Sequence, residues 1–110
     1  MKVEEKGHTV IIKDTQKDIH SFREKIAGGY NSYKDRNIIL DVTHDANVTI
    51  ADILTFKTLS NKHRKAKKSF VMVVNDLDFN EIPDDMLVVP TLLEATDVIE
   101  MEEIERDLGF

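Results

Sequence analysis

The sequence predicts an α/β fold, with a mixed and mostly parallel sheet of four to five strands packed by about three helices. Strand-like and helix-like segments alternate through most of the chain, and a helix between two strands implies a crossover and parallel neighbours. Two runs, "NIILDVT" at 37–43 and "SFVMVV" at 69–74, are almost wholly apolar, which is typical of central strands buried on both faces. With 110 residues, we expect one domain spanning 1–110.

The N-terminal third predicts a hairpin followed by a helix. The run "HTVIIKD" at 8–14 is rich in β-branched residues, and Gly7 suggests a turn between it and the charged segment before it. A helix is predicted over 15–36, because apolar residues recur there at spacings of three and four: Ile19, Phe22, Ile26, Tyr30 and Tyr33. The pair Gly28-Gly29 lies inside this pattern, and we interpret it as a soft point in a continuous helix.

A second helix is predicted over 49–68. Thr49 is a good N-cap, and Asp52 stands three residues later, which makes an acid variant of the capping box. Lysines and an arginine gather at the C-terminal end, where cations suit the helix dipole. The packing side of this helix is expected to consist of Ile50, Ile53, Leu54, Phe56 and Leu59.

The last part of the chain predicts a loop, a short strand and a final helix. The polar segment 75–85 leaves room for one helical turn at most, and 86–90 reads as a short strand that Pro90 ends. The helix is predicted over 91–110, with Thr91 and Glu94 as a second capping box. Its apolar side is expected to consist of Leu92, Ala95, Thr96, Ile99, Met101, Ile104 and Leu108.

Composition excludes several classes of protein. The chain has no run of 18 apolar residues, so we expect no membrane span, and its first residues lack the apolar core of a secretory signal. There is no cysteine, which excludes disulfides and thiolate metal sites and fits a reducing, cytoplasmic location. The net charge of −6 does not favour a general nucleic-acid binder.

The charge is unevenly distributed along the chain. Residues 61–68 hold five Lys or Arg, whereas residues 94–107 hold seven acids and one Arg. This polarity suits docking to a charged partner, although two solvated helix faces would explain it equally. Contact between Lys62–Lys68 and nucleic acid is a minor alternative.

One cluster of acids and a histidine invites a catalytic interpretation. It consists of Asp41, His44, Asp45 and Asp52, and such groups can run acid–base chemistry or bind a metal. No pair of histidines has the spacing of a metal motif, and no Gly-rich phosphate loop is present. We therefore expect no metal and no cofactor, and we interpret the cluster as surface loop residues.

The order of elements and three segments resemble the STAS domain, the fold of the anti-sigma-factor antagonists. The segments that carry the resemblance are "NIILDVTHDANVTIADILTF", "KSFVMVV" and "LVVPTLLEATDVIEM". The resemblance itself spans nearly the whole chain. In that family a strand ends in Asp-hydrophobic-Ser/Thr, and a later helix opens with Thr/Ser-x-x-Glu-Ala. Asp41-Val42-Thr43 and Thr91-Leu92-Leu93-Glu94-Ala95 stand in those places.

The resemblance also points to a switch position at the start of the second helix. In that family a partner kinase phosphorylates a serine or threonine in an Asp-Ser-Ser-Gly-like turn, and that turn falls on Thr49-Ile50-Ala51-Asp52. Ile50 and Ala51 replace both hydroxyls, so Thr49 is the one hydroxyl left in the turn. We interpret Thr49 as an N-cap, with a regulated phosphosite as the alternative.

The resemblance implies a non-catalytic, cytoplasmic, bacterial regulatory protein that binds another protein. The expected partner is an anti-sigma factor or a serine-kinase-like protein, docked at the start of the second helix, and a homodimer is compatible with the sequence. The residues expected at the docking surface are His44, Asp45, Thr49, Ile50 and Asp52. The alternative is a small enzyme, or an enzyme subunit, that uses Asp41, His44, Asp45 and Asp52.

Overall fold

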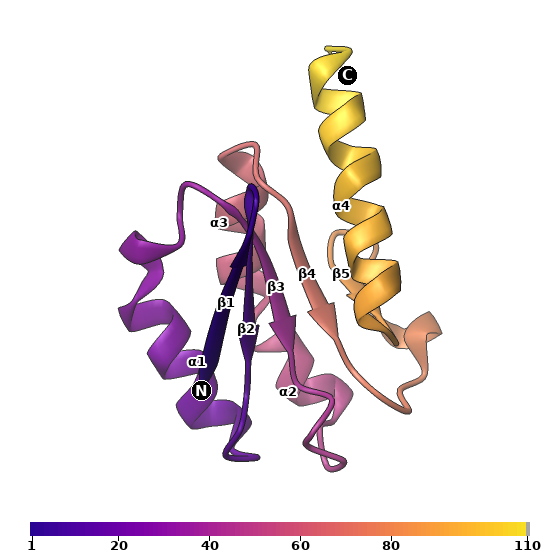
Figure 1. Ribbon diagram of the computed structural model, residues 1–110. Helices are drawn as coiled ribbons and strands as arrows, with labels where there is room; N and C mark the ends of the chain where they lie inside the picture. The colour runs from indigo at the N-terminus through magenta and orange to yellow at the C-terminus, as the bar shows by residue number, and fades with distance from the viewer. Residues whose placement is uncertain (110) are drawn as a thin grey trace.

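The computed structural model describes residues 1–109 and contains one five-stranded sheet in the order β1-β2-β3-β4-β5 (Figure 1). The first pair is antiparallel and the other three pairs are parallel. The predicted α/β class and the mostly parallel sheet are therefore confirmed. The strands are β1 (Lys2–Lys6), β2 (Thr9–Lys13), β3 (Asn37–Asp41), β4 (Phe70–Val73) and β5 (Leu87–Val89).

Helices cover both faces of the sheet. The α-helices are α1 (Ile19–Gly28), α2 (Ile50–Leu54), α3 (Lys57–Lys65) and α4 (Leu92–Asp107), and the 3₁₀ turns are η1 (Tyr30–Ser32) and η2 (Phe79–Glu81). The first three helices pack on one face and α4 packs on the other (Figure 1). Successive strands step in one direction across the sheet, so right-handed crossovers place α1, α2 and α3 on the same side. Within residues 1–109, no helix combines the length and the apolar character that crossing a membrane requires.

The core has two layers, one on each face of the sheet. Strand β3 supplies both, because alternate side chains of a strand point to opposite faces. Ile38 and Leu40 join the larger layer beneath α1–α3, and Ile39 joins the smaller layer beneath α4. The bulkiest fully buried side chains of the larger layer are Phe22, Phe56 and Phe70. The smaller layer consists of Ile11, Ile39, Val71, Val73, Ala95 and Ile99.

The helix predicted over 15–36 is shorter than expected. It begins at Ile19, with Asp18 as its N-cap, and it ends at Gly28. Gly29 occupies the C-cap, where a Cβ would lie 3.2 Å from the carbonyl oxygen of Lys25. The helix therefore ends at the glycine pair instead of continuing through it, and Tyr30 reaches the core from the following 3₁₀ turn.

The second helix is broken where a single helix over 49–68 was predicted. Between α2 and α3, the hydroxyl of Thr55 donates to the carbonyl oxygen of Asp52 at 2.6 Å and so competes with the helical backbone for that acceptor. Phe56 follows the break and is fully buried, as predicted. Leu54, which we also expected to pack, is 39% exposed.

Helix α4 departs from the prediction in its second half. Residue 110, included in the predicted helix, lies outside the described residues, and α4 itself ends at Asp107. Leu92, Ala95 and Ile99 pack on the sheet as predicted, whereas Thr96 is exposed. Met101, Ile104 and Leu108 are 59%, 56% and 67% exposed, so the predicted burial of these three and of Thr96 is wrong. The C-terminal half of α4 rises past the ends of the strands (Figure 1), and the side chains of Met101, Ile104 and Leu108 lie on the side of the helix opposite Ala95 and Ile99, which face the sheet.

A buried histidine joins α3 to the neighbouring elements. His63 Nε2 lies 2.7 Å from the carbonyl oxygen of Arg36, so Nε2 carries the proton and donates it. In the neutral ring Nδ1 is then the acceptor, and it receives the hydroxyl proton of Tyr30. Burial lowers the pKa of His63 below its ordinary value of 6.5 and raises the pKa of the Tyr30 hydroxyl.

The buried neutral His63 makes stability depend on pH. Below pH 6.5 the unfolded chain binds a proton on this ring that the folded protein does not bind. The free energy of unfolding therefore falls as the pH decreases, until the pH is below the lowered pKa of the folded state. Chemical denaturation of the wild type and of His63→Gln between pH 8 and pH 5 should show a shallower loss in the variant. The difference in slope should be at most about 1.4 kcal/mol per pH unit.

The control for this measurement is His44→Gln, because His44 is exposed. Its pH profile should run parallel to that of the wild type. Equal slopes for the wild type and His63→Gln would show that the ring of His63 accepts a proton in the folded state as readily as in the unfolded state.

Candidate functional site

The loop after β3 lies at the carboxyl edge of the parallel strands, where α/β proteins commonly place their binding groups. It runs from residue 42 to the N-cap of α2 at Thr49. The side-chain amide of Asn75, just beyond β4, donates to the carbonyl oxygen of Thr43 at 2.8 Å. The loop is therefore tied to the neighbouring strand and has a defined shape.

The start of α2 is closed by the capping box that the sequence predicted. The backbone N–H of Asp52 donates to the Thr49 hydroxyl at 3.2 Å, and the backbone N–H of Thr49 donates to the Asp52 carboxylate at 3.0 Å. Thr49 is exposed, whereas Ile50 and Asp52 are half-buried. The Thr49 hydroxyl thus accepts from the backbone of Asp52, while the residue remains exposed to solvent.

The other acids of the loop are engaged with local donors. The Asp41 carboxylate accepts from the backbone N–H and the hydroxyl of Thr43, at 3.0 and 2.7 Å. The Asp45 carboxylate accepts from the backbone N–H of Asn47 at 2.9 Å, and both carboxyl residues are buried. His44 points out to solvent between them. Across residues 1–109, histidines and acids are nowhere gathered in threes in a way that could hold a metal ion.

Two residues that the sequence did not assign to this site lie beside it. His20 of α1 places its Nε2 atom 3.8 Å from the Asp52 carboxylate. Asp14, directly after β2, is buried next to Asp41, and its backbone N–H donates to the Asp41 carbonyl oxygen at 3.0 Å. Both contacts join segments that are distant in the sequence, so neither the spacing nor the type of these residues predicts them.

A polar network occupies the opposite edge of the sheet. Asn37, the first residue of β3, and Ser69, directly before β4, are both buried, and the Asn37 side-chain oxygen accepts from the Ser69 backbone N–H at 2.9 Å. The Ser69 hydroxyl donates to Glu102 of α4 at 2.6 Å, and Glu102 also accepts from Arg64 of α3 at 3.1 Å. Arg106 of α4 donates to the Ser69 hydroxyl at 3.2 Å and to the Asn37 side-chain oxygen at 3.3 Å. The network therefore fastens α4 to the sheet and to α3.

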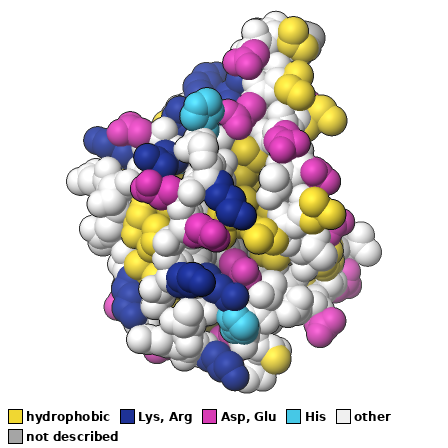
Figure 2. All heavy atoms as spheres, viewed as in Figure 1, with side chains coloured by type: hydrophobic (Ala, Val, Ile, Leu, Met, Phe, Trp, Pro, Cys, Tyr) yellow, Lys and Arg dark blue, Asp and Glu magenta, His cyan; other side chains and the backbone are white. Residues whose placement is uncertain are grey.

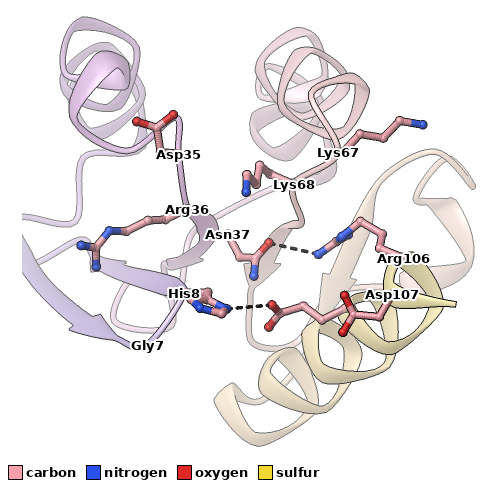
Figure 3. A pocket seen from close by; sticks show the side chains of 10 residues that line it. Gly7, His8, Asp35, Arg36, Asn37, Lys67, Lys68, Arg106 and Asp107 are labelled. Carbon is pink, nitrogen blue, oxygen red and sulfur yellow. Dashed lines mark hydrogen bonds and ion pairs between the residues drawn. The ribbon is translucent and has the colours of Figure 1, made fainter. Parts of the chain in front are cut away.

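A hollow of about 410 Å³ opens beside this network (Figure 3). In this hollow Arg106 points toward Asn37, and Nδ1 of His8 lies 3.2 Å from the carboxylate of Glu103 of α4. The lining carries four Lys or Arg against three acids: Arg36, Lys67, Lys68 and Arg106, with Asp35, Glu103 and Asp107. Because the charges are mixed, the hollow does not select a ligand of one sign.

Comparison with known proteins adds no assignment to either edge. No protein-family model matches the chain, and no curated protein is significantly similar to it.

The polar network at the edge of the sheet where β3 and β4 begin, here called the amino edge, leads to a prediction about how α4 is held. Glu102→Ala removes the acceptor of the buried Ser69 hydroxyl and the partner of Arg64, so it should lower the free energy of unfolding by about 2 kcal/mol or more. Glu105→Ala is the matched control, because Glu105 is exposed on the same helix, and it should change stability by no more than about 0.5 kcal/mol. Urea denaturation measures both, and equal effects would mean that the network does not hold α4 in place.

Proposed function

We propose that this protein is a STAS-like, non-catalytic regulatory module that binds a protein partner through the start of α2. The partner expected from the resemblance to anti-sigma-factor antagonists is an anti-sigma factor or a serine-kinase-like protein, in a bacterial cytoplasm. Of the residues expected at the docking surface, His44 and Thr49 are exposed and Ile50 and Asp52 are half-buried. Asp45 is buried and holds the loop in shape beneath them, and the exposed Ala51 lies next to Ile50.

The observation that carries this proposal is the state of the polar groups around the loop. The carboxylates of Asp41, Asp45 and Asp52 each accept a backbone N–H of the loop itself. Groups held in this way shape the loop, and they leave His44 as the titratable side chain that projects from it. Such a loop offers a fixed, exposed surface for recognition, whereas an acid–base enzyme needs its groups aimed at a common point.

The parallel pairing of β3 with β4 supports the same proposal. Ile38 pairs with Phe70 and Asp41 pairs with Val73, and α2 opens within the crossover that links the two strands. This is the arrangement that the resemblance requires for its switch position. Thr49 keeps a hydroxyl there, but the same turn carries Asp52, whose charge would oppose a phosphate on Thr49.

The proposal is tested by photo-crosslinking in the source cells. A photo-reactive amino acid in place of Ala51, which is exposed in α2, should give a one-to-one adduct with one protein, identified by mass spectrometry. The same residue in place of Glu4, on the exposed edge strand β1, is the matched control and should not give that adduct. Phosphopeptide mapping of the same sample shows whether Thr49 is phosphorylated.

A kinase-like or anti-sigma protein in the Ala51 adduct would support the regulatory role. The absence of any adduct at position 51, or the same adducts at both positions, would contradict docking at the start of α2.

A further inference from the structure

Helix α4 carries most of the large apolar side chains that the protein exposes. Of the seven large hydrophobic residues that are exposed within residues 1–109, four belong to this helix or to its C-cap. They are Leu93, Met101, Ile104 and Leu108, with exposed fractions of 72%, 59%, 56% and 67%. Hydrophobic side chains follow the outer side of α4 in Figure 2, and acidic side chains lie beside them.

The spacing of these residues is that of a helix-packing seam. Asp97, Met101, Ile104 and Leu108 follow one another at intervals of four, three and four, which is the repeat of the a and d positions of a coiled coil. At about 100° per residue, this seam lies opposite Ala95 and Ile99, which face the sheet. The outer side of α4 therefore has the pattern of a helix that packs on a second helix. We name Met101, Ile104 and Leu108 the α4 seam.

Only acids flank the α4 seam. Glu100 and Asp107 lie along one side of it and Glu105 lies along the other, and all are exposed. Arg106, the one cation of α4, is turned to the opposite side, where its guanidinium donates to Ser69 and Asn37. In a coiled coil, the charges beside the seam determine which partner binds.

We propose that the α4 seam binds an amphipathic helix of another protein, with apolar residues in its own seam and Lys or Arg beside them. A second copy of α4 would place acids against acids along both sides of the contact, so charge complementarity favours a basic partner over self-association. Anionic lipid surfaces are disfavoured for the same reason. Asp97 extends the seam by a polar position, which would fix the register against a Lys or Arg of the partner.

This surface is separate from the proposed docking surface at the start of α2. α2 packs on one face of the sheet and α4 packs on the other, and the exposed half of α4 lies at the amino edge of the strands (Figure 1). Binding at one surface leaves the other accessible, so each proposal can fail alone.

The test measures binding of three synthetic peptides to the full chain by fluorescence anisotropy. The first is a helical heptad peptide with Leu at a and d and Lys at e and g, the second has Glu in place of the Lys, and the third has the composition of the first in a scrambled order. The first should bind, and the second and third should bind at least about tenfold more weakly. Raising the salt concentration should weaken the first complex.

Protein variants then locate the contact. Met101→Gln with Ile104→Gln should weaken binding of the Lys peptide by about tenfold or more, and these exposed changes should leave thermal stability unchanged. Val3→Gln, at an exposed apolar residue of β1, is the matched control and should bind as the wild type does. Glu100→Lys with Glu105→Lys should reverse the preference toward the Glu peptide.

Three results would overturn the proposal. They are equal binding of the Lys and Glu peptides, unchanged binding of the Lys peptide by the Gln variant, and a wild-type dimer in sedimentation that the Gln variant loses. The last result would assign the α4 seam to a second copy of the chain.

Discussion

The parallel pairing of β3 with β4, buried on both faces, is the constraint on which the rest of the structure depends. Every residue of the two strands is buried, so each face needs its own cover. The parallel direction requires a crossover between them, and its handedness sends α2 and α3 to the side already taken by α1. The second face is then left to an element after the last strand, and α4 supplies it.

A single helix cannot cover the whole of that second face, and the parts that α4 leaves uncovered carry polar side chains. Lys2, Glu4 and Lys6 of β1 pair with Lys13, Ile11 and Thr9, so the hairpin side of this face is mostly polar and can be solvated. At the other side, the inward positions of the second half of α4 are Glu102 and Arg106, which bond to Ser69. These polar contacts hold α4 by one side, and they turn the α4 seam outward.

The sequence predicted the parts of this structure that local patterns determine. The central strands follow from two unbroken apolar runs, and the closure of α2 follows from Thr49 and Asp52, which are three residues apart. Helix ends were predicted less well, because the backbone geometry at Gly28-Gly29 and the bond from the Thr55 hydroxyl to the backbone are not visible in the periodicity of apolar residues. The long-range polar contacts were not predicted at all, because residue type does not indicate which distant segment supplies the partner. These contacts join His20 to Asp52, Asn37 to Ser69, and Arg106 to Asn37 and Ser69.

The strand arrangement itself is tested most directly by nuclear Overhauser contacts between backbone protons of β3 and β4. We expect the parallel register, with Ile39 opposite Val71 and Leu40 opposite Met72. We also expect slow hydrogen exchange of the Val42 amide, which donates to the carbonyl oxygen of Val73 at 3.0 Å. An antiparallel pattern of contacts, or strands 37–41 and 70–73 without any contact, would contradict it. Either result would remove the crossover that places α2 and, with it, the basis for docking at Thr49.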